Sequence, residues 1–109
     1  MVNVVKSETN IRNIYTYFEF KGYDGWDEFD ILLSVLTNQM GYMPSGKIEG
    51  IYSKHCTLEK DGFTFKLMHH EDFGNCLCSQ EEKDSDYYSQ LEEVAVGTLM
   101  GLKAYREGL

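Results

Sequence analysis

Residues 47–70 read KIEGIYSKHCTLEKDGFTFKLMHH, and this stretch decides the fold. From Phe63 to His70 the apolar residues at odd positions predict a β-strand, because side chains in a strand alternate between two faces. Asp61 and Gly62 precede it and predict a tight hairpin turn, since glycine and a few polar residues tolerate positive φ. We therefore expect residues 47–59 to form one strand that pairs antiparallel with Phe63–His70.

Two further strands are predicted on either side of this hairpin. Residues 14–21 (IYTYFEFK) are dense in β-branched and aromatic residues, which favours a strand. Its even-numbered residues share one face, and Tyr17, Glu19 and the other odd-numbered residues share the opposite face. After a turn at residues 71–75, residues 75–80 predict a short strand that continues the meander.

Two helices complete the prediction. Residues 26–40 and 85–106 carry apolar side chains at steps of three and four, which is typical of amphipathic helices. Asp24 is the expected N-cap of the first helix. Gly97 and Gly101 lie four apart and are expected to let the second helix approach the sheet closely. The predicted order is β-α-β-β-β-α: an α+β fold in which two helices cover one face of an antiparallel sheet of about four strands. Ser85 is the candidate N-cap of the second helix, and the uncovered face is expected to carry tyrosines and charges.

The composition fits a single domain over residues 1–109, with 42% hydrophobic and 26% charged residues and one proline. The formal net charge of -8 disfavours binding to nucleic acid or to anionic lipid and favours a basic protein partner. No apolar run approaches the ~20 residues of a membrane span, and no secretory signal opens the chain. Three cysteines are an odd count, so we expect a reducing, cytoplasmic location.

Histidine and cysteine are the residue types here that could support catalysis or metal binding. Cys76 and Cys78 are two apart, so they share a strand face that either His69 or His70 could approach. Their spacing matches no recognised zinc pattern, and no oxyanion hole or nucleophile elbow accompanies them. The glycines match no phosphate-binding motif. We therefore expect buried thiols, no catalytic residues, no metal and no cofactor.

Acidic residues gather at the start of both predicted helices and in the turn between them. If these clusters share one side of the molecule, their field would steer a basic protein toward it. Nearby aromatic residues are of the types that anchor protein interfaces. The alternative is that helix starts collect acids for capping and solubility alone. The residues predicted to bind a partner are Tyr23, Asp24, Trp26, Asp27, Glu71, Asp72, Glu81, Glu82, Asp84, Asp86 and Tyr87.

The stretch KLMHHEDFGNCLC at residues 66–78, followed by an acidic linker and an amphipathic helix, resembles bacterial immunity proteins. These are the cognate inhibitors of contact-dependent and other polymorphic toxins, and the likeness is one of architecture and composition over the whole chain. It implies a protein that binds and neutralises a cognate toxin domain, a basic nuclease, through an acidic surface bearing aromatic side chains. The alternative is a small cytoplasmic oligomeric binding or regulatory module with no catalytic activity, which would form a homodimer through the uncovered sheet face.

Overall fold

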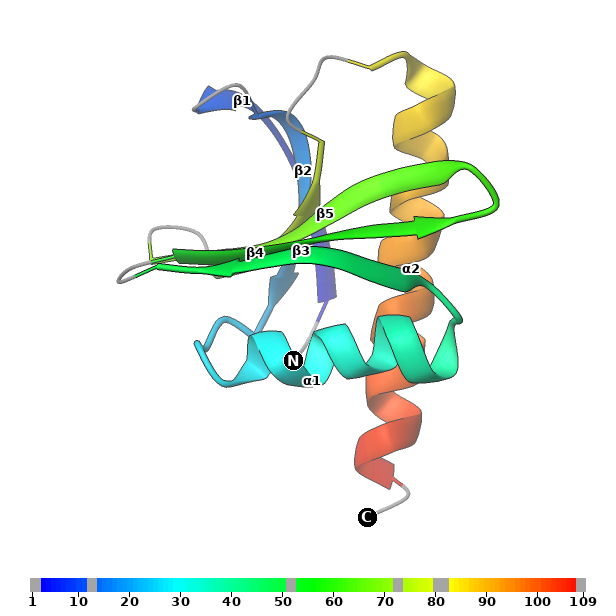
Figure 1. Ribbon diagram of the computed structural model, residues 1–109. Coiled ribbons are helices and arrows are strands. Elements are labelled where there is room, and N and C mark those ends of the chain that lie inside the picture. The colour runs from blue at the N-terminus through cyan, green and yellow to red at the C-terminus, as the bar shows by residue number, and fades with distance from the viewer. Residues whose placement is uncertain (1–2, 12–13, 51–52, 72–73, 80–82, 108–109) are drawn as a thin grey trace.

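The chain folds into one six-stranded antiparallel sheet with helices against one side, as a computed structural model shows (Figure 1). The structure describes residues 3–11, 14–50, 53–71, 74–79 and 83–107. Along the chain the elements are β1 (Asn3–Ile11), β2 (Ile14–Lys21), α1 (Glu28–Ser34), the π-helical η1 (Val35–Gln39), β3 (Met43–Glu49), β4 (Ser53–Lys60), β5 (Phe63–His70), β6 (Gly74–Cys78) and α2 (Ser85–Glu107).

The strands lie in the order β1-β2-β6-β5-β4-β3, so β6 and β5 are central and β1 and β3 are the edges. Every neighbouring pair is antiparallel. Figure 1 shows that the sheet is strongly twisted, with β1 and β2 turned away from the direction of β3, β4 and β5. The α+β prediction, with an antiparallel sheet and two helices on one face, is confirmed.

Two regions of the sheet differ from the sequence prediction. Residues 47–59 do not form one strand: the chain reverses after β3, where the Gly50 N–H donates to the Ser53 carbonyl at 2.7 Å. Strand β3 also begins earlier, at Met43, and bulges at Gly46, whose φ of 60° is accessible to glycine at no steric cost. Strand β1 was not predicted, because its polar sequence lacks an alternating pattern.

The main hydrophobic core lies between the sheet and the helices. Phe18 and Phe20 of β2 and Phe65 and Leu67 of β5 point into it, which confirms the predicted alternation in both strands. Burial of large aromatic and aliphatic side chains is the main favourable term in such a fold. Helix residues that meet them in the core are Phe29, Leu32, Val35, Leu36, Leu91, Val94, Ala95 and Leu102.

The face of the sheet away from the helices is also buried, contrary to expectation. Tyr17, Met68, Cys76 and Cys78 form a second buried cluster there. Glu19 lies on the same face at 5% exposure, with its carboxylate 2.7 Å from the ammonium group of the exposed Lys21. The central part of this face is therefore closed, and the expected tyrosine surface for docking is not present there.

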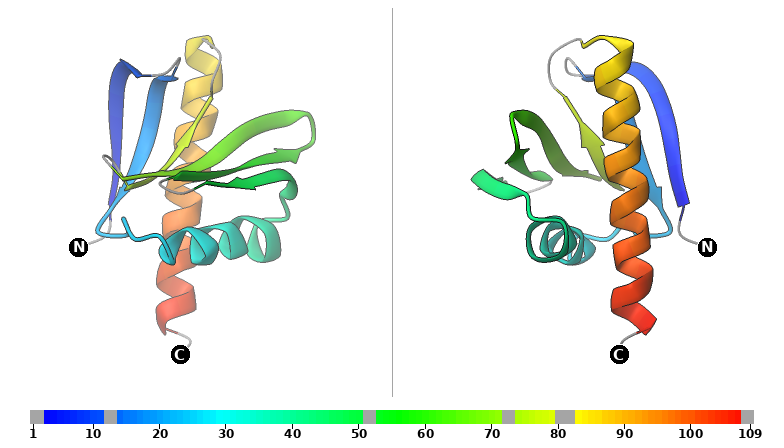
Figure 2. Two further views of the ribbon diagram at one scale, coloured as in Figure 1. Left: turned by 60° about the vertical axis from the view of Figure 1, so that its left-hand side comes forward. Right: turned by 90° about the vertical axis from the view of Figure 1, so that its right-hand side faces the viewer.

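Helix α2 packs against η1 as well as against the sheet (Figure 2). A Cβ atom at Gly101 would lie 2.6 Å from Cγ1 of Val35, and one at Gly97 would lie 3.0 Å from Cε of Met40. The two glycines therefore permit a helix-to-helix contact rather than the predicted helix-to-sheet contact. No helix within the described residues has the length and apolarity required to cross a membrane.

Candidate functional site

The loop between β2 and α1 holds four of the predicted partner-binding residues. Gly22 starts it at a φ of 89°, and the Tyr23 N–H donates to the Phe20 carbonyl at 3.0 Å. The Gly25 N–H donates to Oε1 of Glu28 at 2.7 Å. Helix α1 begins at Glu28 with Asp27 before it, and Asp27 makes no side-chain cap. The prediction of Asp24 as the N-cap is therefore wrong, because the Glu28 carboxylate satisfies a backbone donor of this loop instead.

Beneath this loop, three polar residues form a row across neighbouring strands. Lys54 of β4 is paired with His69 of β5, and His69 is paired with Asn75 of β6. All three are buried on the helix side of the sheet, Lys54 at 1% exposure. Buried polar groups are costly unless they are hydrogen-bonded or paired, so each of them requires a partner nearby.

Asn75 holds the loop to the sheet. Its Nδ2 donates to the carbonyls of Tyr23 at 2.8 Å and Gly25 at 3.0 Å, and its Oδ1 lies 3.0 Å from Nδ1 of His69. Because the amide group uses both protons on the two carbonyls, Oδ1 is the acceptor, and His69 must carry a proton on Nδ1. The amide thus fixes both the loop conformation and the tautomer of the histidine.

Lys54 and His69 together support the ring of Trp26. The Lys54 ammonium lies 4.4 Å from the centre of the Trp26 ring and 4.9 Å from that of Phe29, within cation–π range. The His69 ring meets Trp26 edge-on, with centroids 5.3 Å apart. The Asp30 carboxylate forms an ion pair with Lys54 at 3.7 Å and accepts a hydrogen bond from Lys47 at 3.2 Å. Trp26 is consequently held half-buried in one orientation.

Three exposed carboxylates lie in the loop of Trp26 and at the strand end next to that loop. Asp24 and Asp27 flank it in the loop, and both are exposed. Glu71, also exposed, follows the end of β5, beside the start of β6. A Cβ atom at Gly74 would lie 2.7 Å from Oδ1 of Asp24, so the start of β6 touches the loop directly. We call Asp24, Trp26, Asp27 and Glu71 the Trp26 patch.

The second group of predicted residues lies at the start of α2. Oδ1 of Asp84 accepts the Tyr87 N–H at 2.9 Å, so Asp84 caps α2 in place of the predicted Ser85. Tyr87 is half-buried, and its hydroxyl donates to the Thr64 carbonyl at 2.7 Å. Asp86 is exposed beside it.

The two acidic groups do not form one surface. Tyr87 contacts β5 near its beginning, at Thr64, whereas the Trp26 patch meets the end of β5 and its partner residue Gly74. Six residues of strand separate Thr64 from His70, which corresponds to about 20 Å. Figure 1 shows the start of α1 and the start of α2 at opposite ends of the molecule. Among the described acids, those near Trp26 therefore lie apart from those at the start of α2.

Tyr23 lies in the core and not at the surface. Tyr23 is 4% exposed and belongs to the hydrophobic core, so it offers a partner no side-chain surface. The sequence did not show this, because the tyrosine lies in a loop with charged neighbours. Asp72, Glu81 and Glu82 lie outside the described residues.

The thiols and histidines are divided between the two faces of the sheet. Cys76 and Cys78 are free and buried on the face away from the helices. His69 points to the helix side, whereas His70, in register with Gly74, lies on the same face as the two cysteines. The hydrogen bond to Cys78, together with burial, raises the pKa of the Cys76 thiol well above its usual range, which disfavours the nucleophilic thiolate. Within the described part of the chain, no three His, Cys, Asp or Glu side chains are placed to hold a metal ion.

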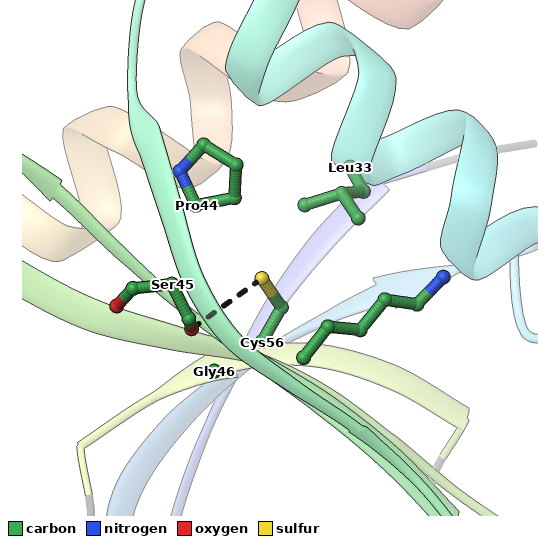
Figure 3. A pocket seen from close by; sticks show the side chains of 6 residues that line it. Leu33, Pro44, Ser45, Gly46 and Cys56 are labelled. Atoms are coloured by element: carbon green, nitrogen blue, oxygen red, sulfur yellow. Dashed lines mark hydrogen bonds between the residues drawn. The ribbon is translucent and has the colours of Figure 1, made fainter.

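A small open pocket of about 300 Å³ lies between α1 and edge strand β3 (Figure 3). The thiol of Cys56 points into it between Leu33 and Pro44 and is 3.9 Å from the Ser45 carbonyl. Burial raises the pKa of this thiol, so it stays protonated near neutral pH. Leu33 and Pro44 give the pocket apolar walls, and the Cys56 thiol and the Lys47 side chain also line it.

Sequence reasoning overlooked the buried row of Lys54, His69 and Asn75. A signal for it exists, because Lys54 is in phase with the apolar residues Cys56 and Leu58 along β4. A lysine on the apolar side of a strand indicates a buried charge that needs a partner.

No protein-family model matches this sequence, and no curated protein or solved structure matches it either.

Proposed function

We propose that this protein is an immunity-type inhibitor that binds and neutralises a basic toxin domain, and that the Trp26 patch is its interface. The observation that carries this proposal is the tryptophan ring held half-buried over Lys54 and His69, with the exposed carboxylates of Asp24 and Asp27 beside it. The immunity-protein resemblance of the sequence supplies the class of partner.

The support beneath Trp26 favours tight binding. Tryptophan is among the residues that contribute most to interface energies. Its ring is already immobilised by the cation and the imidazole, so little conformational entropy remains to be lost when a partner packs on it. The hydrogen bonds from Asn75 to Tyr23 and Gly25 keep the loop in place in the same way.

The charge around the ring selects the partner. Asp30 is paired with two lysines, whereas no ion pair among the described residues engages Asp24, Asp27 or Glu71. These carboxylates are therefore available to lysine and arginine side chains of a basic surface. A nuclease cleft that binds nucleic-acid phosphates presents such side chains, and carboxylates placed there would exclude the substrate.

The first test is to recover the partner from the native cells by affinity purification and to identify it by mass spectrometry. Recovery of one basic toxin domain in equal amount supports the proposal. Binding should then weaken as salt is raised, mainly through a slower association rate. Recovery of this chain alone, or of an acidic protein, refutes the proposal.

Two variants with the same change in net charge then locate the interface. The Asp24→Asn, Asp27→Asn, Glu71→Gln variant removes three charges from the Trp26 patch. The control, Asp61→Asn, Asp84→Asn, Asp86→Asn, removes three exposed charges near the start of α2. Asparagine suits both the cap position of Asp84 and the φ of 53° at Asp61, so the control should fold normally.

At low salt the patch variant should bind the toxin domain more than about tenfold more weakly, and the control less than about threefold. Trp26→Ala should also cost more than about tenfold. Equal losses in the two triple variants would show only long-range attraction and would contradict the assignment of the patch. A larger loss in the control would move the interface to the start of α2.

A further inference from the structure

The outward face of α2 carries an exposed apolar pair that the fold does not use. Val96 is 44% exposed and Met100 is 66% exposed. Among the described residues, they are two of the three large hydrophobic side chains that are exposed, and they lie one helical turn apart. In the right-hand view of Figure 2, α2 runs across the front of the molecule with no other element over it.

This pair belongs to a longer pattern. Glu93, Val96, Met100 and Lys103 follow one another at steps of three, four and three, and all four are exposed. That spacing is the seam of a helix pair that packs by knobs into holes. The seam has an apolar centre, an acid at one end and a base at the other.

The charges at its ends determine the orientation that a pair of these helices can adopt. Two parallel copies would place Glu93 against Glu93 and Lys103 against Lys103, so both ends would repel. Two antiparallel copies, related by a two-fold axis at the level of Thr98, place Glu93 of each copy against Lys103 of the other. The same arrangement places Val96 against Met100 on both sides of the axis.

We infer that α2 pairs with α2 of a second copy of this chain, antiparallel, through the seam of Glu93, Val96, Met100 and Lys103. Within the described residues, no ion pair inside the chain engages Glu93 or Lys103, so both charges are available to a second copy. The interface is isologous, and it closes at the dimer without forming filaments. It is independent of the proposed toxin binding, because it uses none of the residues of the Trp26 patch.

The contact consists of one helix pair, so it is smaller than the ~1,600 Å² of a standard stable interface. The dimer should therefore be in equilibrium with the monomer, with a dissociation constant of about a micromolar or weaker. Sedimentation equilibrium of the full chain, over a hundredfold or larger range of concentration, measures it directly.

Charge-swap variants test the orientation and the seam together. Lys103→Glu alone and Glu93→Lys alone should each weaken the dimer more than about tenfold, because each places like charges in contact. The double variant Glu93→Lys, Lys103→Glu should restore dimerisation. Since both positions are exposed, circular dichroism and thermal midpoints should change little in all three variants.

A distance measurement distinguishes the two orientations. A spin label on Gln90→Cys lies eight residues from the two-fold axis in each copy, so antiparallel helices separate the labels by about 24 Å along the axis. Parallel helices would bring them to about 10 Å. The native thiols are buried and should not take up the label.

A wild-type chain that stays monomeric at about 1 mM overturns the inference. A dimer that tolerates Lys103→Glu, or one with the short label distance, also overturns it. A concentration-dependent dimer that is lost in both single variants and regained in the double variant supports it.

Discussion

Replacing Asn75 with alanine should destabilise the protein and loosen the loop that carries Trp26. The side chain is fully buried, and the substitution removes its hydrogen bonds to the Tyr23 and Gly25 carbonyls and to Nδ1 of His69. Each buried group left without a partner costs about 1–3 kcal/mol. Three such groups predict a loss of about 3–9 kcal/mol, a large part of the roughly 5–15 kcal/mol that stabilises a domain.

Urea unfolding followed by two signals measures this loss. Far-UV circular dichroism reports the whole fold, and fluorescence reports the loop, because Trp26 is the only tryptophan in the chain. The variant should unfold at lower urea, and its native-state fluorescence should differ from that of the wild type. If the proposed function holds, it should also bind the toxin domain more weakly, because the loop is no longer fixed.

Thr98→Ala provides the control. It removes a buried hydroxyl that donates to the Val94 carbonyl at 2.7 Å within its own helix, so the expected cost is about 1 kcal/mol. An Asn75→Ala variant that loses no more stability than this control, with unchanged Trp26 fluorescence, would refute the role given to Asn75.

Alanine at the two glycines of α2 should change the free energy of unfolding differently. Gly97→Ala should be neutral or should stabilise the protein by up to about 1 kcal/mol, because the new Cβ meets only the flexible end of Met40. Gly101→Ala should destabilise the protein by about 1–3 kcal/mol, because the new Cβ meets the stiff, buried side chain of Val35. Urea midpoints decide this, and equal effects at the two glycines would contradict the packing described. Burial, with a smaller contribution from Lys66, lowers the pKa of His55 in the folded protein below the ordinary value of 6.5. The neutral imidazole therefore favours the folded state above the unfolded-state pKa, and this stabilisation is lost as the pH falls below the unfolded-state pKa. The loss of stability on acidification from about pH 8 to about pH 5 should be smaller in His55→Gln, and an unchanged pH profile would count against this account.

Much of the fold follows from local patterns in the sequence. Residues 14–21 and 63–70 alternate with a period of two, and residues 85–106 repeat with the period of a helix, so their elements and the faces that meet in the main core were predictable. Asp61 and Gly62 also fixed the β4–β5 turn, and both adopt positive φ. Strand β1 was not predictable in this way, because an edge strand is held by backbone hydrogen bonds to β2 and needs no apolar pattern of its own.

By itself, the sequence determined the fold class, the acidic charge, the free cysteines and the acids at the helix starts. The tertiary structure alone decided which of these residues meet. Strand pairing placed Lys54 beside His69 and His69 beside Asn75, although they lie in three different strands. The length of β5 separated the acids near Trp26 from those near Tyr87. The physical reason is that a period along the chain fixes the face on which a side chain lies, whereas its neighbours on that face depend on strand order and register, which are set by contacts between distant residues.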